Sequence, residues 1–202
     1  MDKPTKNDHA ILGALRQRWS PYAFQDKPIP KETLLSLMEA ARWSASCFGE
    51  QPWRFIVGIK ETDPETFEKL ASTLVEVNYA WASKAPVLML GVAKMTFTYN
   101  GSPNRWGPYD VGQAVGQLTV QAASNGLYLH QMGGFSPEKA RELFHIPEGY
   151  EPQAMISLGY LGEASLLGDE ALQARHNSPE RVRKPLTELV FTDWETPSSL
   201  VK

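Results

Sequence analysis

The chain has 202 residues, 42% of them hydrophobic, and a formal net charge of −3. Its length fits one domain with room for a core, and no apolar run is long enough to cross a bilayer, which excludes a membrane-spanning protein. The slightly acidic balance provides no general attraction for nucleic acid or for an anionic membrane, so recognition depends on local charge.

The first eight residues are polar and lack the apolar core of a signal peptide, and the single cysteine, Cys47, cannot form an internal disulfide. Both observations are consistent with a reducing compartment, and we expect a cytoplasmic protein. No repeat, low-complexity tract or linker divides the chain, so we expect one domain over residues 1–202.

Hydrophobic periodicity predicts helices and strands that are interspersed along the chain. Helices are expected to include residues 11–15, 31–43, 67–75, 111–122 and a segment opened by Ser136, and strands are expected at 53–59, 86–93, 127–132 and 154–161. Asp110 is expected to cap the fourth helix and Gly126 to end it. Residues 94–109, rich in glycine, proline and aromatic side chains, are expected to form a long loop. The predicted class is α+β, a mixed β-sheet flanked by helices.

Most familiar catalytic motifs are missing from the sequence. The histidines are scattered, and none has metal-ligand spacing to Cys47 or to a carboxylate, so we expect no metal site. There is no G-x-S-x-G nucleophile elbow, no Walker loop and no G-x-G-x-x-G turn. A bound phosphate would therefore have to be held by side chains rather than by a glycine-rich backbone.

Arginines near the two ends of the chain are the candidates for that role. Arg18 and Ser20 stand in one segment, and Arg181 and Arg183 stand in the other. Planar guanidinium groups match phosphate oxygens, and each charge-assisted hydrogen bond contributes about 1.5–3 kcal/mol. On spacing alone, solvated surface arginines are the simpler interpretation. Residues 44–49 and 133–134 also have two interpretations: each could be an ordinary loop or turn, or a segment whose backbone approaches a ligand.

Together these segments resemble the nitroreductase family of FMN-dependent oxidoreductases. The family's R-R-S-x-R-x-F motif is similar to residues 18–24, and its A-P-S-S-x-N-x-Q-P-W-x-F segment is similar to residues 45–55. A G-G-F or E-G-F turn corresponds to residues 133–135, and a basic R-x-R-x-P-L segment to residues 181–186. The resemblance implies a nitroreductase-like fold and an intertwined homodimer, in which a C-terminal tail of about residues 163–202 wraps the partner subunit.

The resemblance also assigns cofactor-binding residues position by position. The phosphate and ribityl end of FMN would be bound by Arg18, Ser20, Arg181 and Arg183, and Trp19 and Tyr22 in the same first segment are further cofactor-binding positions. Asn78 resembles an asparagine at the polar edge of the flavin, and Gly133 and Gly134 would place N–H groups near flavin N5 and O4. The flavin of the neighbouring subunit would be reached by Ser46, Cys47 and Gly49.

Several positions depart from the family pattern. Trp19 replaces a common arginine or histidine and Tyr22 replaces a basic residue, so phosphate binding would depend on fewer cations. Gly49 stands where asparagine is frequent, and Cys47 where serine is frequent. Trp81 occupies a place where some members have a lysine near the pyrimidine edge of the flavin. These departures bear on the reduction potential and on the choice of acceptor.

The implied function is that of an FMN-dependent NAD(P)H oxidoreductase. Hydride would pass from NADH or NADPH to flavin N5 and on to a nitroaromatic, quinone or similar small acceptor. No side-chain acid or base is required, so we name no catalytic residue. The alternatives are a specialised member acting on flavin itself or on a halogenated or peptide-derived substrate, and a flavin-binding or regulatory protein without turnover.

The loop at residues 94–109 is expected to shape the substrate side of the site. It carries Phe97, Tyr99 and Trp106, whose rings could stack on a planar acceptor. A loop of this length without a periodic pattern is typical of a lid or a binding loop. The alternative interpretation is that these aromatic side chains anchor the loop to the core.

Overall fold

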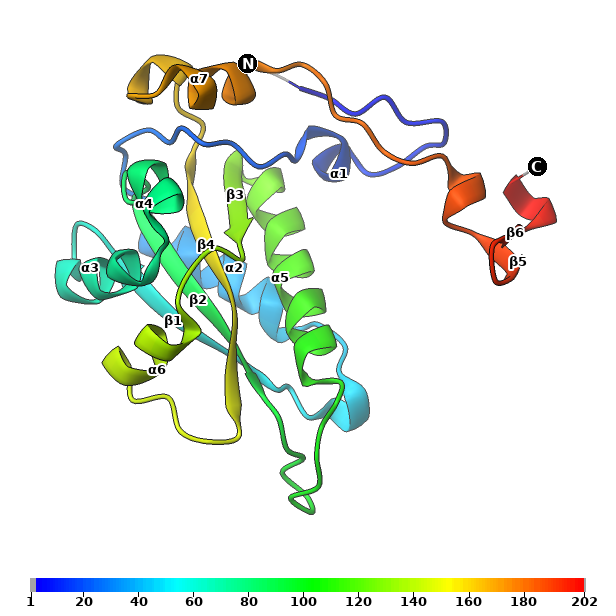
Figure 1. The fold of residues 1–202 in the computed structure, drawn as a ribbon, viewed down its shortest axis with the longest axis horizontal. Helices are drawn as coiled ribbons and strands as arrows, with labels where there is room; N and C mark the ends of the chain where they lie inside the picture. Colours follow the sequence, from blue (N-terminus) through cyan, green and yellow to red (C-terminus); the bar gives the residue numbers. More distant parts are fainter. Residues whose placement is uncertain (1–2, 202) are drawn as a thin grey trace.

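The computed structural model describes residues 3–201 and shows helices packed on both faces of a four-stranded β-sheet (Figure 1). The sheet has the strand order β1-β2-β4-β3. Its strands are β1 (Trp53–Ile59), β2 (Val87–Lys94), β3 (Leu127–Met132) and β4 (Tyr150–Tyr160). The helices are α1 (Gly13–Gln17), α2 (Lys31–Arg42), α3 (Pro64–Thr73), α4 (Glu76–Ala82), α5 (Gly107–Ser124), α6 (Pro137–Leu143) and α7 (Glu170–Asn177).

The α+β class is confirmed, but every strand pairing of the described sheet is antiparallel, where a mixed sheet was expected. Helices between strands favour parallel crossovers. Here, however, the end of β1 lies beside the start of β2, with Ile59 paired to Val87, so the chain returns to the sheet at the end it left. The helical excursion through α3 and α4 therefore connects two antiparallel neighbours.

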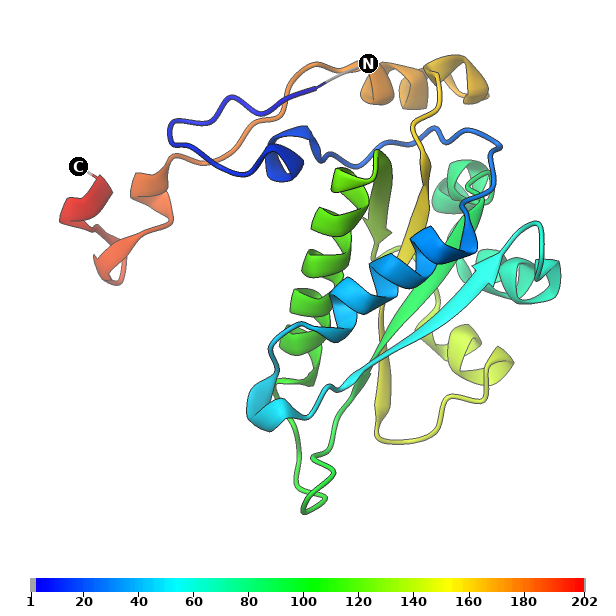
Figure 2. The ribbon, with the colours of Figure 1, turned by 180° about the vertical axis from the view of Figure 1, so that it is seen from behind.

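Each face of the sheet carries its own hydrophobic core. Figure 2 shows α2 and α5 crossing one face, where Leu37, Leu118 and Ile156 are buried. The other face packs against α3, α4 and α6 around Phe67 and Trp81. Strand β2 runs between the two cores and is buried from Val87 to Ala93, as its continuous apolar sequence predicts.

The start of α5 differs from the prediction. The helix begins at Gly107, so the expectation that Asp110 caps it is wrong. Asp110 lies in the first turn, is buried, and accepts a hydrogen bond of 3.0 Å from the backbone N–H of Cys47. A Cβ at Gly107 would lie 2.6 Å from the carbonyl oxygen of Lys94, so only glycine fits where the helix leaves the preceding loop. The C-terminal end agrees with the prediction, since Gly126 follows it with φ of 70°.

Beyond α7 the chain leaves the body as an extended segment, residues 178–201, which we call the arm. Figures 1 and 2 show the arm running beside the N-terminal segment and then projecting away. It carries a hairpin of β5 (Phe191–Asp193) and β6 (Thr196–Pro197), followed by a short 3-10 helix, Ser199–Val201. Its apolar side chains are bare: Trp194 is 82% exposed and Leu200 is 83% exposed. The earlier part of the expected tail packs on its own chain, where Leu167 and His176 are buried. No helix of residues 3–201 is both long and apolar enough to cross a membrane.

Candidate functional site

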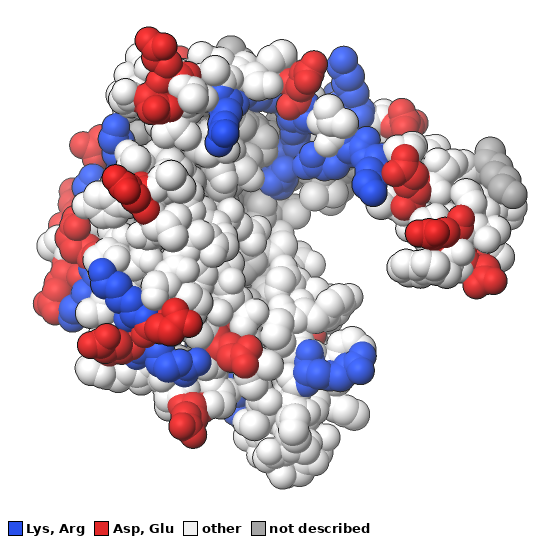
Figure 3. All heavy atoms as spheres, viewed as in Figure 1, with Lys and Arg blue, Asp and Glu red and all other residues white. Residues whose placement is uncertain are grey.

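Cations from both ends of the chain meet in one cavity of about 270 Å³. Its lining includes four of the residues expected to bind phosphate, Arg18, Ser20, Arg181 and Arg183, together with Trp19. Lys3 and Arg175 add two further cations. Figure 3 shows lysine and arginine side chains gathered where the arm leaves the body, above an open notch in the molecular outline. Such a concentration of positive charge attracts an anion.

Three of the four arginines that line this cavity, Arg18, Arg181 and Arg183, are bonded differently. The guanidinium of Arg181 donates to the carbonyl oxygens of Lys3 (2.7 Å), Arg16 (3.0 Å) and Arg18, so it braces the N-terminal segment. Among the described residues, the guanidinium of Arg183 donates only to the adjacent carbonyl of Val182. Within residues 3–201, the Arg18 guanidinium has no hydrogen-bond acceptor. Burial, and then the charge of Arg183, lower the pKa of Arg18. The Arg175 guanidinium likewise has no acceptor within residues 3–201, so Arg18, Arg175 and Arg183 are the guanidiniums available to an anion.

An aromatic cluster connects this cavity to α4 and β3. Tyr22, Trp81 and His130 have ring centroids 4.5–5.1 Å apart. Nδ1 of His130 lies 2.9 Å from the carbonyl oxygen of Pro21, so Nδ1 donates there. Burial lowers the pKa of His130, which favours the neutral ring. Trp81 is only 1% exposed, so its side chain belongs to the core.

The end of β3 meets α4 through the next pair of expected site residues. Nδ2 of Asn78 donates to the carbonyl oxygen of Gly134 at 3.0 Å. A Cβ at Gly134 would lie 2.5 Å from that Nδ2 atom, so a side chain there would displace Asn78. Gly133 is exposed, and a Cβ there would meet no heavy atom within 4 Å. The backbone at Gly133 is thus open to close approach by a ligand.

Ser46, Cys47 and Gly49 lie in a tightly turned loop before β1. The hydroxyl of Ser46 accepts from the N–H of Gln51 at 3.0 Å, and the Cys47 N–H bond to Asp110 joins the loop to α5. Gly49 has a φ of 65°, and Phe48 has a φ of 53°, which is strained for a residue with a side chain. Phe48 is also 81% exposed. Sequence reasoning did not single out Phe48, although its position inside the matched segment was a signal.

The expected loop is shorter than predicted and is ordered as a hairpin. Thr96 and Pro103 form a bridge, and the N–H of Phe97 donates to the carbonyl oxygen of Ser102 at 2.9 Å. Phe97 is buried, so it anchors the hairpin, as the alternative interpretation held for all three aromatic residues. Tyr99 and Trp106 are 64% and 41% exposed, and their rings remain accessible.

Glu50 ties this hairpin to the strained loop. Its carboxylate accepts from the N–H of Thr98 at 2.9 Å, from the Thr98 hydroxyl, and from the ammonium of Lys94 at 3.0 Å. Burial alone would raise the pKa of Glu50, but these hydrogen bonds lower it below its usual range. The ring of Phe48 packs edge-on against both Phe97 and Tyr99 at 5.9 Å. The two segments therefore form one surface, which the sequence pattern did not reveal.

Two groups of the expected site residues lie at opposite ends of α5, and Asn78, Gly133 and Gly134 form a third where β3 meets α4. The strained loop and the hairpin adjoin its first turn through Asp110. The first arginine segment follows α1, which packs on α5 and lies beside its C-terminal end in Figure 1. A helix of 18 residues is about 27 Å long. The two groups of one chain thus do not meet in one pocket.

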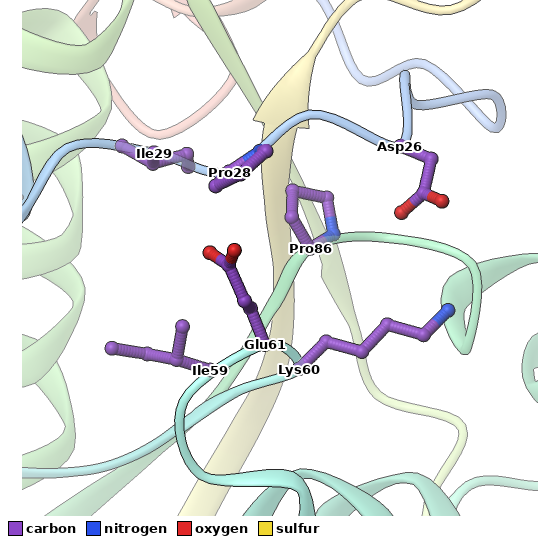
Figure 4. Close-up of a pocket in the computed structure, with 7 residues that line it drawn as sticks. All are labelled: Asp26, Pro28, Ile29, Ile59, Lys60, Glu61 and Pro86. Carbon is purple, nitrogen blue, oxygen red and sulfur yellow. The ribbon is translucent and has the colours of Figure 1, made fainter.

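Another hollow, of about 340 Å³, lies beside the start of β2 (Figure 4). It is lined by Asp26, Pro28, Ile29, Ile59, Lys60, Glu61 and Pro86. None of the expected site residues lies there. Within residues 3–201, no group of three or more histidine, cysteine, aspartate and glutamate side chains is placed to hold a metal ion.

Comparison with known proteins identifies the family. The model of the Nitroreductase family matches residues 15–160. An "Uncharacterized 15.4 kDa protein in ask 5'region" of Mycolicibacterium smegmatis is 36% identical over 155 residues, which cover 71% of this chain and 99% of that protein. A "Putative NADH dehydrogenase/NAD(P)H nitroreductase" of Methanothermobacter thermautotrophicus is 30% identical over 157 residues, 76% of this chain and 78% of that protein. A crystal structure titled "the oxidoreductase containing FMN" matches with a TM-score of 0.85 and 32% identity over 93% of both chains. The chain belongs to the nitroreductase family.

Proposed function

We propose that this protein is an FMN-dependent oxidoreductase that uses NADH or NADPH to reduce a small acceptor. The observation that carries the proposal is the half-buried guanidinium of Arg18, which faces a cavity of cations and has no acceptor among residues 3–201. A charged donor left unsatisfied is unfavourable, and a phosphate group would satisfy it with strong, charge-assisted bonds. The solved relative that contains FMN and the relative named for NAD(P)H support this choice of cofactor and donor.

FMN, when bound, would supply the hydride chemistry, while the chain would bind and orient it. Arg18, Arg183 and Ser20 are placed to hold the phosphate. The open backbone at Gly133 would admit the ring, and the bond between Asn78 and Gly134 keeps that backbone in place. The neutral His130 and the buried Trp81 contribute no permanent positive charge near this segment.

We further propose that the working unit is a homodimer. Two groups of the expected site residues lie at opposite ends of α5, so a second copy would be needed to bring Ser46, Cys47 and Gly49 to the arginine cavity. The bare apolar side chains of the arm require cover that one chain does not provide. An isolated two-stranded hairpin is marginal in water, which also favours a partner surface for β5 and β6.

The acceptor side of the site favours a planar aromatic compound such as a nitroarene or a quinone. Phe48, Tyr99 and Trp106 present exposed rings, and stacked or edge-to-face aromatic pairs contribute about 0.5–1.5 kcal/mol beyond area burial. The hairpin that carries two of these rings is fixed by Glu50, so it offers a preformed surface.

A visible spectrum of the purified protein, followed by anaerobic titration with NADH and NADPH, tests the oxidoreductase. Bleaching of a bound flavin by either nucleotide is expected. A bound flavin that neither nucleotide reduces would instead support a binding protein without turnover. An apoprotein that does not bind FMN would refute the assignment of FMN as cofactor. Light scattering of dilute holoprotein tests the dimer, and a flavin-loaded monomer would contradict it.

A further inference from the structure

We propose that Lys3 is a ligand of the cofactor phosphate, held in place by Trp19, so that the N-terminal segment forms one wall of the phosphate site. This inference rests on the proposed FMN function. It concerns a residue that lies well before the first family motif and outside residues 15–160, the range matched by the family model.

Lys3 is buried and is one of the residues that line the cation cavity. The residue is 5% exposed and lines the cavity with Arg18 and Arg183. Its ammonium donates to the carbonyl oxygen of His176, and Nζ lies 4.0 Å from the ring centroid of Trp19. An ammonium has three N–H donors. The carbonyl uses one and the ring face attracts another, which leaves a donor for a ligand in the cavity.

Among residues 3–201, the carboxylate of Glu180 lines the cavity beside five cationic side chains, so the lining keeps an excess of positive charge. Of the described residues, no carboxylate forms an ion pair with Lys3, Arg18 or Arg183. Burial, and then the charge of Arg181, lower the pKa of Lys3, because both disfavour the ammonium form. A phosphate dianion in the cavity would reverse this effect, since an opposite charge at short range favours the protonated lysine.

Trp19 shows why the charge comes from position 3. The family resemblance implies a basic residue at position 19, and the ring of Trp19 instead forms the surface beneath the Lys3 ammonium. Trp19 is 6% exposed, and its buried Nε1 has no hydrogen-bond partner among the described residues. The ring is held edge-on by His176 at 5.1 Å. The basic charge missing from the motif is therefore replaced by a lysine from another segment.

The N-terminal segment is fixed well enough to act as part of a site. Arg181 donates to the carbonyl oxygen of Lys3, and the N–H of Thr5 donates to the carbonyl oxygen of Arg16 at 3.0 Å. These bonds hold the segment against Arg181 and against α1. The competing interpretation is that Lys3 only attaches the segment to α7, through its hydrogen bond to the carbonyl oxygen of His176. The two interpretations differ in whether the lysine interacts directly with the phosphate group.

Comparison of FMN with riboflavin, which lacks the phosphate, separates them. In Lys3→Met the apolar stem remains over Trp19 while the charge is lost. We expect the apoprotein to bind FMN about tenfold more weakly, which is a change of about 1.4 kcal/mol, and to bind riboflavin unchanged. Lys27→Met is the matched control, because Lys27 also lies over a ring, 4.2 Å from that of Tyr160, but outside the cavity. Fluorescence quenching and calorimetry of the apoproteins would measure both affinities.

An equal loss of FMN and riboflavin affinity, or an unchanged FMN affinity, overturns the role of Lys3. Failure of the unmodified apoprotein to bind FMN at all refutes the proposed function itself. Should Lys3→Met not fold, the unmodified protein provides a second readout. The indole N–H resonance of Trp19, assigned with Trp19→Phe, should shift on addition of FMN and not on addition of riboflavin. An equal response to both ligands contradicts the proposal.

Discussion

Alanine substitution of two arginines of the same cavity should affect different properties: Arg181→Ala should lower stability, and Arg18→Ala should lower FMN affinity. The guanidinium of Arg181 donates to three backbone carbonyls, whereas that of Arg18 donates to none among residues 3–201. A hydrogen bond to a charged group contributes about 1.5–3 kcal/mol. Because water can replace part of this at a half-buried site, we expect Arg181→Ala to lower the unfolding free energy of the apoprotein by about 2–4 kcal/mol. For a chain of this size that corresponds to roughly 5–15 °C in Tm.

Arg18→Ala should leave the Tm of the apoprotein unchanged or slightly higher, since burial and the neighbouring Arg183 already disfavour this charge. Its FMN affinity should fall by about 1.5–3 kcal/mol, or roughly one to two decades in Kd. Differential scanning calorimetry of apoproteins and FMN titration would measure both quantities, with the exposed Arg16→Ala as the control. Similar destabilisation by both substitutions, or an Arg18→Ala protein with full FMN affinity, would refute the division of roles.

Three further outcomes are expected. Gly134→Ala should displace Asn78, because the new Cβ would lie 2.5 Å from its Nδ2; weaker FMN binding measured by titration is the expected result, and an unchanged affinity contradicts it. Burial, and then the charge of Lys3, lower the pKa of His176 from its usual value of 6.5, so the unfolded chain binds the proton more readily than the folded protein. The free energy of unfolding should therefore be highest above pH 6.5 and fall below it. His176→Asn, which keeps an acceptor for the N–H of Ala23, should flatten that decline in urea melts. Trp106→Ala should change the ratio of kcat/KM between a quinone and a nitroarene without altering the flavin spectrum; equal scaling of both acceptors would make the ring structural.

Local sequence patterns located the four strands of the sheet, although β4 begins at Tyr150 rather than at the expected residue 154. The alternation of apolar residues gave the bounds of β1 (Trp53–Ile59) correctly, and the capping serine and proline at Ser136 marked the start of α6. Helix α4 escaped detection because Val77 and Tyr79 point outward, at 72% and 45% exposure, which hides the amphipathic pattern of a short helix. The cap assigned to Asp110 was wrong because its carboxylate bonds a distant segment.

The candidate site was predicted through the family resemblance rather than through local patterns. The meeting of Arg18 with Arg181 and Arg183 in one cavity follows from matching separate motifs to one family. Lys3 could not be found in this way, because it lies outside every motif and acts through contacts with residues far along the chain. Glu50 is a similar case, since nothing in its own segment indicates that Thr98 is its partner. Long-range polar contacts of this kind have no periodicity to read.

The bonds of Glu50 have a consequence for engineering the acceptor surface. Loops are usually exchanged between relatives one at a time, on the assumption that each behaves independently. Here the hairpin of residues 95–106 and the strained loop of residues 46–51 share one buried carboxylate, so a graft of either alone would leave Glu50 or Thr98 without its partner. A new substrate range would therefore be reached by transplanting both segments together, as a single cassette with Lys94 retained.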